Sequence, residues 1–266
     1  MRIVVTLLIA VLVAACTAPS APVLQTAASK NITNRSAPQF GDSDPYEWTA
    51  RKPWTYAIHG IDVARYQNRI DWKKVRRANV SFAYIKATEG GDHLDERFAE
   101  NWRAARRAGV LRGAYHYYYF CRTAAEQARW FIRNVPRDPK MLPPVLDIEW
   151  NPLSPTCKLR PEPRKVRREM RVFLQTISQH YGKRPVIYAT PDFYQDNQLW
   201  RVSGYDFWLR SVADHPSDRY PGRKWAFWQY TSTGVVPGIE GDADINAFKG
   251  SAEQWQAWLA ANGVAP

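Results

Sequence analysis

The stretch PVLDIEW, residues 144–150, places two acidic residues inside an otherwise apolar run. A short apolar run of this length predicts a buried β-strand. Side chains two residues apart in a strand point to the same face, so Asp147 and Glu149 should project together. Paired carboxyl groups are typical of sites that break glycosidic bonds, because one can stay protonated while the other is charged. A surface strand with two unrelated acids is the alternative, which the apolar flanks disfavour.

Short apolar runs and helical patterns alternate on both sides of this stretch, from about Trp54 onward. The apolar runs predict eight strands, at residues 57–63, 80–87, 111–119, 144–149, 185–189, 206–209, 225–230 and 243–245. The helical patterns predict helices at residues 71–78, 95–108, 124–134, 163–181 and 251–262. We expect an α/β fold, a TIM-like (β/α) barrel with helices reduced in its second half. An open doubly wound sheet is the alternative, and the lack of a glycine-rich phosphate loop disfavours it.

Reactive groups gather at the carboxyl ends of the strands in such barrels. Acidic residues stand at these places: the first strand ends at Asp62, the fourth carries Asp147 and Glu149, and the last ends at Asp244. A second set of residues at comparable places are candidates for sugar contacts, namely Tyr117, Tyr188, Trp208 and Gln229. For each of these four, filling the barrel core is an equally good interpretation. Glu89 ends the second strand, where we expect a structural ion pair.

The N-terminus has the pattern of a bacterial export signal. Arg2 precedes the short apolar run of residues 3–13, and small residues then lead to Cys16. The sequence VAAC that ends at Cys16 resembles a lipobox, in which the cysteine becomes the lipidated first residue. We expect a signal peptide of the lipoprotein type at residues 1–15. An ordinary signal peptide with an incidental cysteine is the alternative.

The following segment is expected to connect the lipid to a folded domain. Residues 16–50 are rich in Ala, Ser, Pro and Thr, and so they predict a flexible tether. The folded domain would then span residues 51–266. Export implies oxidising conditions, and Cys121 and Cys157 follow neighbouring strands of the expected barrel. We therefore expect a disulfide between these two cysteines.

The formal net charge of +12 favours polyanionic partners, such as nucleic acid, anionic lipid or an acidic cell-wall polymer. Basic runs at residues 73–77 and 164–168 lie in predicted helices, where a solvated helix face is the simpler interpretation. No nucleic-acid-binding motif is present, and the export signal argues against a nucleic-acid partner.

Several segments together resemble glycoside hydrolase family 25, the Chalaropsis-type lysozymes. They occur in the family's order and cover roughly residues 57–262. The segments are residues 60–63 (GIDV), 66–67 (YQ), 70–72 (IDW), 82–90 (FAYIKATEG), 108–110 (AGV), 113–117 (GAYHY), 146–149 (LDIE), 228–232 (WQYTS) and 244–248 (DINAF). One such piece alone would be weak, whereas their number and order make the resemblance specific.

The resemblance implies a barrel with incomplete helices that cleaves the β-1,4 bond between N-acetylmuramic acid and N-acetylglucosamine in peptidoglycan. It implies Glu149 as the general acid and Asp147 as the partner that steers or stabilises the substrate's acetamido group. Asp62 and Asp244 match the remaining acids of the active-site floor, and Asp242 is a weaker candidate for the last position. No metal and no organic cofactor is implied. The expected partners are peptidoglycan glycan strands, with membrane contact only through the N-terminal lipid of an exported, anchored monomer facing the periplasm or cell wall.

Two other functions are compatible with parts of the sequence. A chitinase-like hydrolase would carry a longer acidic ladder, but Val145 and Pro143 precede Asp147 here, so that ladder is absent. A non-catalytic peptidoglycan-binding lipoprotein would not need a proton donor, yet all four acids are present. Ala64 and Arg65 depart mildly from the family pattern, which bears on substrate fit rather than on the proposed catalytic groups.

Overall fold

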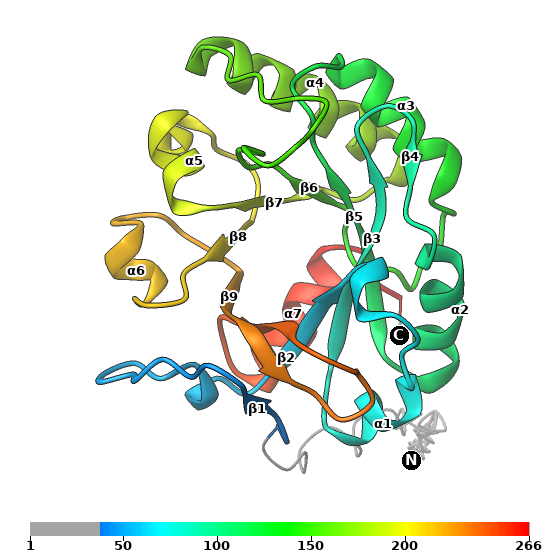
Figure 1. Cartoon of the computed structure of the whole chain (residues 1–266), viewed down its shortest axis with the longest axis vertical. Helices are drawn as coiled ribbons and strands as arrows, with labels where there is room; N and C mark the ends of the chain where they lie inside the picture. The colour runs from blue at the N-terminus through cyan, green and yellow to red at the C-terminus, as the bar shows by residue number, and fades with distance from the viewer. Residues whose placement is uncertain (1–37, 266) are drawn as a thin grey trace, which may run out of the picture. The chain divides into compact units, whose positions relative to one another are not determined.

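Eight strands close into a barrel in the computed structural model, which describes residues 38–265 (Figure 1). The barrel is closed because β8 pairs with β9. Its strands, in chain order, are β2 (His59–Val63), β3 (Phe82–Glu89), β5 (Leu111–Tyr117), β6 (Val145–Asp147), β7 (Val186–Ala189), β8 (Phe207–Arg210), β9 (Phe227–Val235) and β10 (Ala243–Phe248). Two short strands extend the sheet, β1 (Gly41–Asp42) beside β9 and β4 (His93–Leu94) beside β3.

One strand of the barrel runs against the others. The pairings from β2 through β3, β5, β6, β7 and β8 to β9 are parallel, whereas β10 is antiparallel to both β9 and β2. The expectation that Asp244 ends its strand is therefore wrong, because Asp244 is the second residue of β10. The reversed direction brings the beginning of β10 to the rim where β2 ends, and Asp244 pairs in register with Asp62.

The helices lie outside the barrel, and α7 packs against the lower end of its interior. Figure 1 shows α1 to α4 along one side and α7 behind the strands. Their bounds are α1 (Trp72–Arg77), α2 (Phe98–Ala108), α3 (Ala124–Asn134), α4 (Pro163–Tyr181), α5 (Pro191–Asp196), α6 (Pro216–Arg219) and α7 (Ala252–Ala261). Single 3₁₀ turns occur at η1 (Pro53–Thr55), η2 (Arg65–Gln67) and η3 (Leu199–Arg201). Among residues 38–265, no helix combines the length and the apolarity needed to cross a bilayer.

Local sequence signals set the helix ends. The Asp71 carboxylate accepts hydrogen bonds from the backbone N–H groups of Lys73 and Lys74 at the start of α1. Gly109 ends α2 in the left-handed conformation, at φ 75°, which glycine adopts at little cost. Ser251 and Gln254 form a capping box at the start of α7. The short helices α5 and α6 were not predicted, because a single turn carries no readable helical period.

Aromatic rings fill the lower part of the barrel. Phe82 and Phe227 pack against each other and against Trp255 of α7, with ring centroids 5.2–6.2 Å apart. Above them, Tyr84 stacks on Trp208 at 5.1 Å. Gly60 gives the Phe82 ring its space, because a Cβ atom on Gly60 would lie 2.5 Å from that ring. The interior is therefore a packed core, open to solvent only at its upper rim.

Part of the predicted tether lies against the barrel. The signal peptide of residues 1–15, Cys16 and the tether up to residue 37 lie outside the described residues. Within residues 38–50, Gly41 pairs with Val235 of β9, and Trp48 packs edge-on against Trp228 at 5.1 Å. This packing differs from the flexible tether predicted for residues 16–50. Phe40 and Trp48 supply the apolar surface for it, although the segment as a whole contains few large apolar residues.

A disulfide joins the two loops that follow β5 and β6. Cys121 and Cys157 have Cα atoms 5.8 Å apart and are 36 residues apart in the sequence. Their strands are neighbours, since Tyr117 pairs in register with Asp147. This is the pairing expected from the sequence, and it fixes the loop of residues 148–162, which has no regular secondary structure of its own.

Replacing both cysteines by serine should lower the free energy of unfolding by about 3–4 kcal/mol, because a crosslink between residues 36 apart restricts the unfolded chain. Urea unfolding followed by circular dichroism measures the change, and wild-type protein unfolded under reducing conditions should behave like the variant. Equal unfolding midpoints for the variant and the oxidised wild type would contradict the expectation.

Candidate active site

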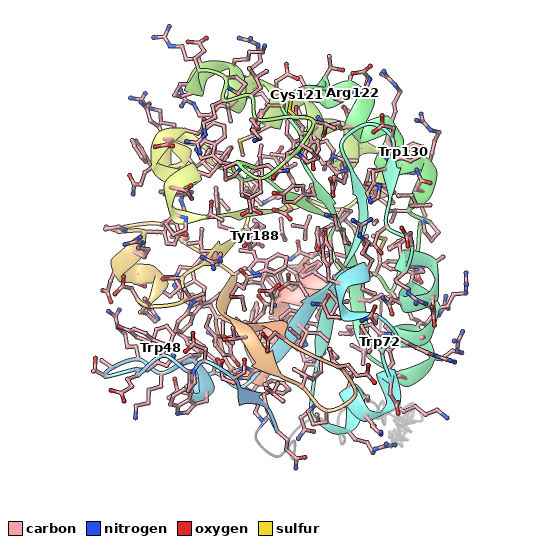
Figure 2. The ribbon with its side chains drawn as sticks, in the orientation of Figure 1. Trp48, Trp72, Cys121, Arg122, Trp130 and Tyr188 are labelled. Carbon is pink, nitrogen blue, oxygen red and sulfur yellow. A yellow bond between two sulfur atoms is a disulfide. The ribbon has the colours of Figure 1, made fainter. Side chains whose placement is uncertain are left out.

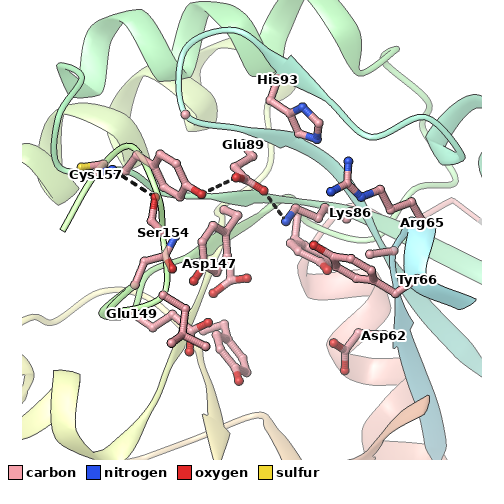
Figure 3. Close-up of a pocket in the computed structure, with 18 of the residues that line it drawn as sticks. Asp62, Arg65, Tyr66, Lys86, Glu89, His93, Asp147, Glu149, Ser154 and Cys157 are labelled. Atoms are coloured by element: carbon pink, nitrogen blue, oxygen red, sulfur yellow. Dashed lines mark hydrogen bonds and ion pairs between the residues drawn. The ribbon is translucent and has the colours of Figure 1, made fainter. Parts of the chain in front are cut away.

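A cleft of about 970 Å³ opens at the carboxyl ends of the parallel strands. All four acids singled out from the sequence line it: Asp62, Asp147, Glu149 and Asp244. In Figure 3, the side chains of Asp62, Asp147 and Glu149 face the same open space. The loops after β2, β3, β5 and β6 form the outer wall, which includes the disulfide. Groups far apart in the sequence thus meet in one concave surface.

Strand register explains why the central residues come together. Tyr117 of β5, Asp147 of β6 and Tyr188 of β7 stand at successive paired positions. Parallel strands in this register carry these side chains at one level of the barrel. The prediction that Glu149 lies within the strand is wrong, because β6 ends at Asp147. Glu149 stands two residues beyond the strand end and still lines the same cleft.

Asp62 lies in a hydrogen-bonded network on the cleft floor. Its Oδ1 accepts hydrogen bonds from Gln229 Nε2 at 3.0 Å and Asn246 Nδ2 at 2.8 Å. Burial raises the pKa of Asp62 to about 6, against the opposing effect of these hydrogen bonds. The Asp244 carboxyl also hydrogen-bonds Asp62, and burial and the nearby Asp62 charge raise the pKa of Asp244 well above its usual value. These directions favour a protonated Asp244 that donates its hydrogen bond to Asp62.

Glu149 has the electrostatic setting of a proton donor at neutral pH. Burial raises its pKa from 4.5 to about 7. A hydrogen bond from the Tyr117 hydroxyl and the charge of Arg210 act in the opposite direction. A carboxyl group with a pKa near 7 is still largely protonated in the pH range in which most carboxyl groups have lost their proton.

Asp147 is as deeply buried as Asp62. It is 8% exposed, and its Oδ1 has no hydrogen-bond partner within residues 38–265. Burial and the neighbouring Glu149 raise the pKa of Asp147 well above its usual value, and the charge of Lys86 opposes this. An unpartnered buried acceptor beside an open cleft is suited to an N–H donor from a ligand.

The four residues considered for sugar contacts take different positions. Trp208 is only 2% exposed and donates its indole N–H to Asn246 Oδ1 at 2.7 Å, so most of it fills the barrel. Tyr188 donates its hydroxyl to Gln229 Oε1 at 2.8 Å. Trp208, Tyr188 and Gln229 thus support the cleft floor and present only part of their surface to the cleft. Tyr117 is more accessible and contacts Glu149 directly.

Several residues of the cleft were not assigned a role from the sequence. Lys86 Nζ lies 2.6 Å from Glu89 Oε2, which is the structural ion pair expected for Glu89. The Tyr119 hydroxyl donates to the same carboxylate. Arg210, the last residue of β8, also lines the cleft. The strand-end rule would have found Arg210 if the predicted strand had not stopped at residue 209, whereas Lys86 stands inside its strand and gives no such signal.

No group of three or more His, Cys, Asp or Glu side chains in the described part of the chain is arranged to hold a metal ion. Asp62, Glu149 and Asp244 instead hydrogen-bond side-chain amides, a tyrosine hydroxyl and one another. Four Lys and Arg side chains also line the cleft: Arg65, Lys86, Arg122 and Arg210.

Comparisons with known proteins agree with this arrangement. The model of glycosyl hydrolases family 25 matches residues 61–239. Lysozyme M1 of Streptomyces globisporus is 38% identical over 226 residues, which cover 78% of this chain and 73% of that protein. Protein YegX of Escherichia coli K12 is 36% identical over 225 residues, covering 83% of this chain and 80% of YegX. The structure of a family 25 glycosyl hydrolase from Bacillus anthracis superimposes with a TM-score of 0.70 at 35% identity, covering 82% of this chain and 98% of that one.

The family match spans more than half of the chain and includes Asp62, Asp147 and Glu149, while Asp244 lies just beyond its end. The closed barrel, the acid-lined cleft and the sequence similarity thus point to one conclusion. The chain belongs to glycosyl hydrolases family 25 and is a glycoside hydrolase.

Proposed function

We propose that the protein is a muramidase that cleaves the β-1,4 bond between N-acetylmuramic acid and N-acetylglucosamine in peptidoglycan. The supporting observation is the pair Asp147 and Glu149 on one wall of a cleft large enough for several sugar rings. Its similarity to lysozyme M1 supports the same substrate. We also propose that the barrel is TIM-like, with its helices reduced in the second half.

Glu149 is the general acid in this proposal. It donates its proton to the glycosidic oxygen as the bond from the muramic anomeric carbon breaks. The pKa of about 7 keeps that proton available near neutral pH. After the leaving sugar departs, the same carboxylate can take a proton from the attacking water.

Asp147 stabilises the positive charge that develops. In the route we favour, the substrate's acetamido oxygen attacks the anomeric carbon and forms an oxazolinium ion, whose N–H donates to Asp147. Before the bond breaks, the neutral acetamido N–H of the bound substrate donates to Asp147 and favours its ionised form, so within the coupled pair the proton stays on Glu149 until it is transferred. Water then opens the ring with retention of configuration. Direct attack by water would instead invert the configuration, and the anomer released distinguishes the two routes.

The other residues act around this pair. Asp62 and Asp244 hold one shared proton on the floor and position the hydrogen-bonding groups of Gln229 and Asn246. Tyr117 orients Glu149, while Tyr188 and Trp208 shape the sugar-binding surface. A cofactor has no step in this mechanism.

Digestion of purified sacculi tests the proposal against its competitors. Products are reduced with borohydride and analysed by mass spectrometry. Reduced muramic acid ends support a muramidase, whereas reduced glucosamine ends indicate a glucosaminidase and 1,6-anhydro ends a lytic transglycosylase. Absence of released fragments would instead support a non-catalytic peptidoglycan-binding lipoprotein.

Glu149→Gln should lower the rate of sacculus digestion by about 10²–10⁴-fold, because glutamine cannot donate the proton. The variant should fold, and at pH 8 it should unfold at a temperature no lower than the wild type. The sign follows from the raised pKa: the folded wild type loses stability as pH rises from 4.5 through about 7, and glutamine does not ionise. Glu240→Gln, at an exposed acid outside the cleft, is the control and should retain full activity. Wild-type rates in Glu149→Gln would remove Glu149 from the mechanism.

The rate of hydrolysis should fall as the pH rises above about 7, because Glu149 must be protonated to act. Tyr117→Phe should move this alkaline limb to higher pH, since the Tyr117 hydrogen bond lowers the pKa of Glu149. Tyr119→Phe is the matched control, because its hydroxyl donates to Glu89 instead. Hydrolysis rates measured from pH 5 to pH 9 define the alkaline limb. An unchanged alkaline limb in Tyr117→Phe would contradict the proposed effect of Tyr117 on the pKa of Glu149.

We further propose that the protein is exported as a monomeric lipoprotein anchored through Cys16, facing the periplasm or cell wall. Arg2, the apolar run of residues 3–13 and the small residues before Cys16 support the lipid anchor. Residues 17–37 would then separate the lipid from the domain that begins near residue 38.

Cys16→Ser should move the protein from the membrane fraction to the soluble exported fraction, because serine cannot carry the thioether-linked lipid. Fractionation of expressing bacteria and labelling with radioactive palmitate measure the two effects. Membrane association that persists without label in both proteins would exclude Cys16 as the anchor.

A further inference from the structure

The first half of α4 carries an unusual concentration of positive charge. Residues 163–171 contain five basic residues and one acidic residue. Arg164, Arg168 and Arg171 are exposed and share one helix face, because they stand at positions i, i+4 and i+7. Within residues 38–265, none of these three side chains forms an ion pair. Figure 2 shows nitrogen-tipped side chains projecting outward along the edge that α4 forms.

This charge arrangement does not stabilise the helix that bears it. The positive end of the helix dipole lies at the N-terminus of α4, where cations are unfavourable, and no acidic residue occupies the first turn. Arg164 and Arg168 are four residues apart, a spacing at which like charges repel. Arg167 is crowded as well, since burial and then the charges of Arg201, Arg164 and Arg171 lower its pKa. The cluster therefore calls for an explanation other than helix stability.

The basic residues of α1 and α2 provide the contrast. Arg76 and Arg77 lie in the last turn of α1, and Arg106 and Arg107 lie in the last turn of α2. Cations at a helix C-terminus complement the dipole and stabilise the helix. The simple interpretation of a solvated helix face thus suits residues 73–77 but not residues 164–168.

The α4 cluster follows, along the chain, a loop that forms part of the cleft wall. The loop of residues 151–157 lines the cleft wall, and α4 begins six residues after Cys157. Between them, the Arg160 guanidinium lies 5.0 Å from the ring of Trp150, the residue that follows Glu149. The Cys121–Cys157 disulfide holds this loop in place just before α4 begins.

We propose that Arg164, Arg168 and Arg171 form a binding surface for the carboxylates of peptidoglycan stem peptides and hold the enzyme on the intact sacculus. The identity of the polymer rests on the proposed function. A glycan strand that occupies the cleft carries stem peptides on its muramic acid residues and belongs to a polyanionic network. Exposed guanidinium groups on the helix that follows the cleft wall are complementary to that charge, because planar guanidinium pairs well with carboxylate.

The test measures binding separately from catalysis. All proteins carry Glu149→Gln so that the sacculi stay intact, and binding is followed by co-sedimentation with purified sacculi. The triple variant Arg164→Gln, Arg168→Gln, Arg171→Gln should bind about tenfold more weakly than the parent in low salt, and the difference should shrink in high salt. The matched control Arg77→Gln, Arg103→Gln, Arg107→Gln removes three exposed arginines from α1 and α2. It should change the affinity less than about twofold.

A second arm identifies the chemical group that is bound. Sacculi whose carboxylates have been amidated with methylamine should bind the parent as weakly as untreated sacculi bind the triple variant, and amidation should have no further effect on that variant. Parent binding that survives amidation would overturn the proposal in favour of phosphate groups in the wall. A triple variant that loses binding to phosphatidylglycerol vesicles but keeps binding to sacculi would assign the surface to a membrane instead.

The outcome is independent of whether the protein is a muramidase. Equal affinities of the parent, the triple variant and the control for untreated sacculi would overturn the proposed surface even if the wild type releases reduced muramic acid ends. A wild type that releases no reduced muramic acid ends would overturn the proposed activity. Weaker co-sedimentation of the triple variant would still support the proposed binding surface in that case. Circular dichroism of the triple variant confirms that a loss of binding is not a loss of fold.

Discussion

Several carboxyl groups are kept together in this protein where water solvates their charge poorly, and the rest of the structure depends on that constraint. Charged carboxylates at close range repel each other and lose hydration free energy on burial. In the cleft, some of the acids keep their protons and others accept hydrogen bonds from neighbouring side chains, which reduces this energetic cost. Asp62 receives hydrogen bonds from Gln229 and Asn246. Asp147 keeps an oxygen that has no partner among residues 38–265, and a substrate can satisfy it.

The rigid barrel offsets the energetic cost of burying these carboxyl groups together. Aromatic packing below the cleft fixes the strands, and strand register then fixes the level at which each polar side chain emerges. Trp208 belongs to both regions, since its ring packs on Tyr84 while its indole N–H holds Asn246 in place. Stability generated in the apolar core is thus available to offset the cost of the buried charges above it, as is common where sites are built on rigid elements.

The sequence predicted long, strongly patterned elements well and single-turn or directional features poorly. Helices α3 and α4 match residues 124–134 and 163–181, because both are amphipathic over several turns and α3 has a complete capping box. The direction of β10 could not be read from its own residues, since a strand looks the same in parallel and antiparallel sheets. The acids were found because they interrupt apolar runs near strand ends. Lys86 was missed because it stands inside a strand. Its role in the cleft depends on its contacts with Glu89 and Tyr117, which the strand pattern does not reveal.

Helix α7 has a consequence for how a polymer can meet this enzyme. Trp255 of α7 packs beneath Phe82 and Phe227 and seals the lower end of the barrel. A long chain therefore cannot thread through the molecule and must lie across its mouth, with both ends free to extend away. Such geometry permits attack in the middle of a strand, so neither a free terminus nor stepwise processing from one end is required.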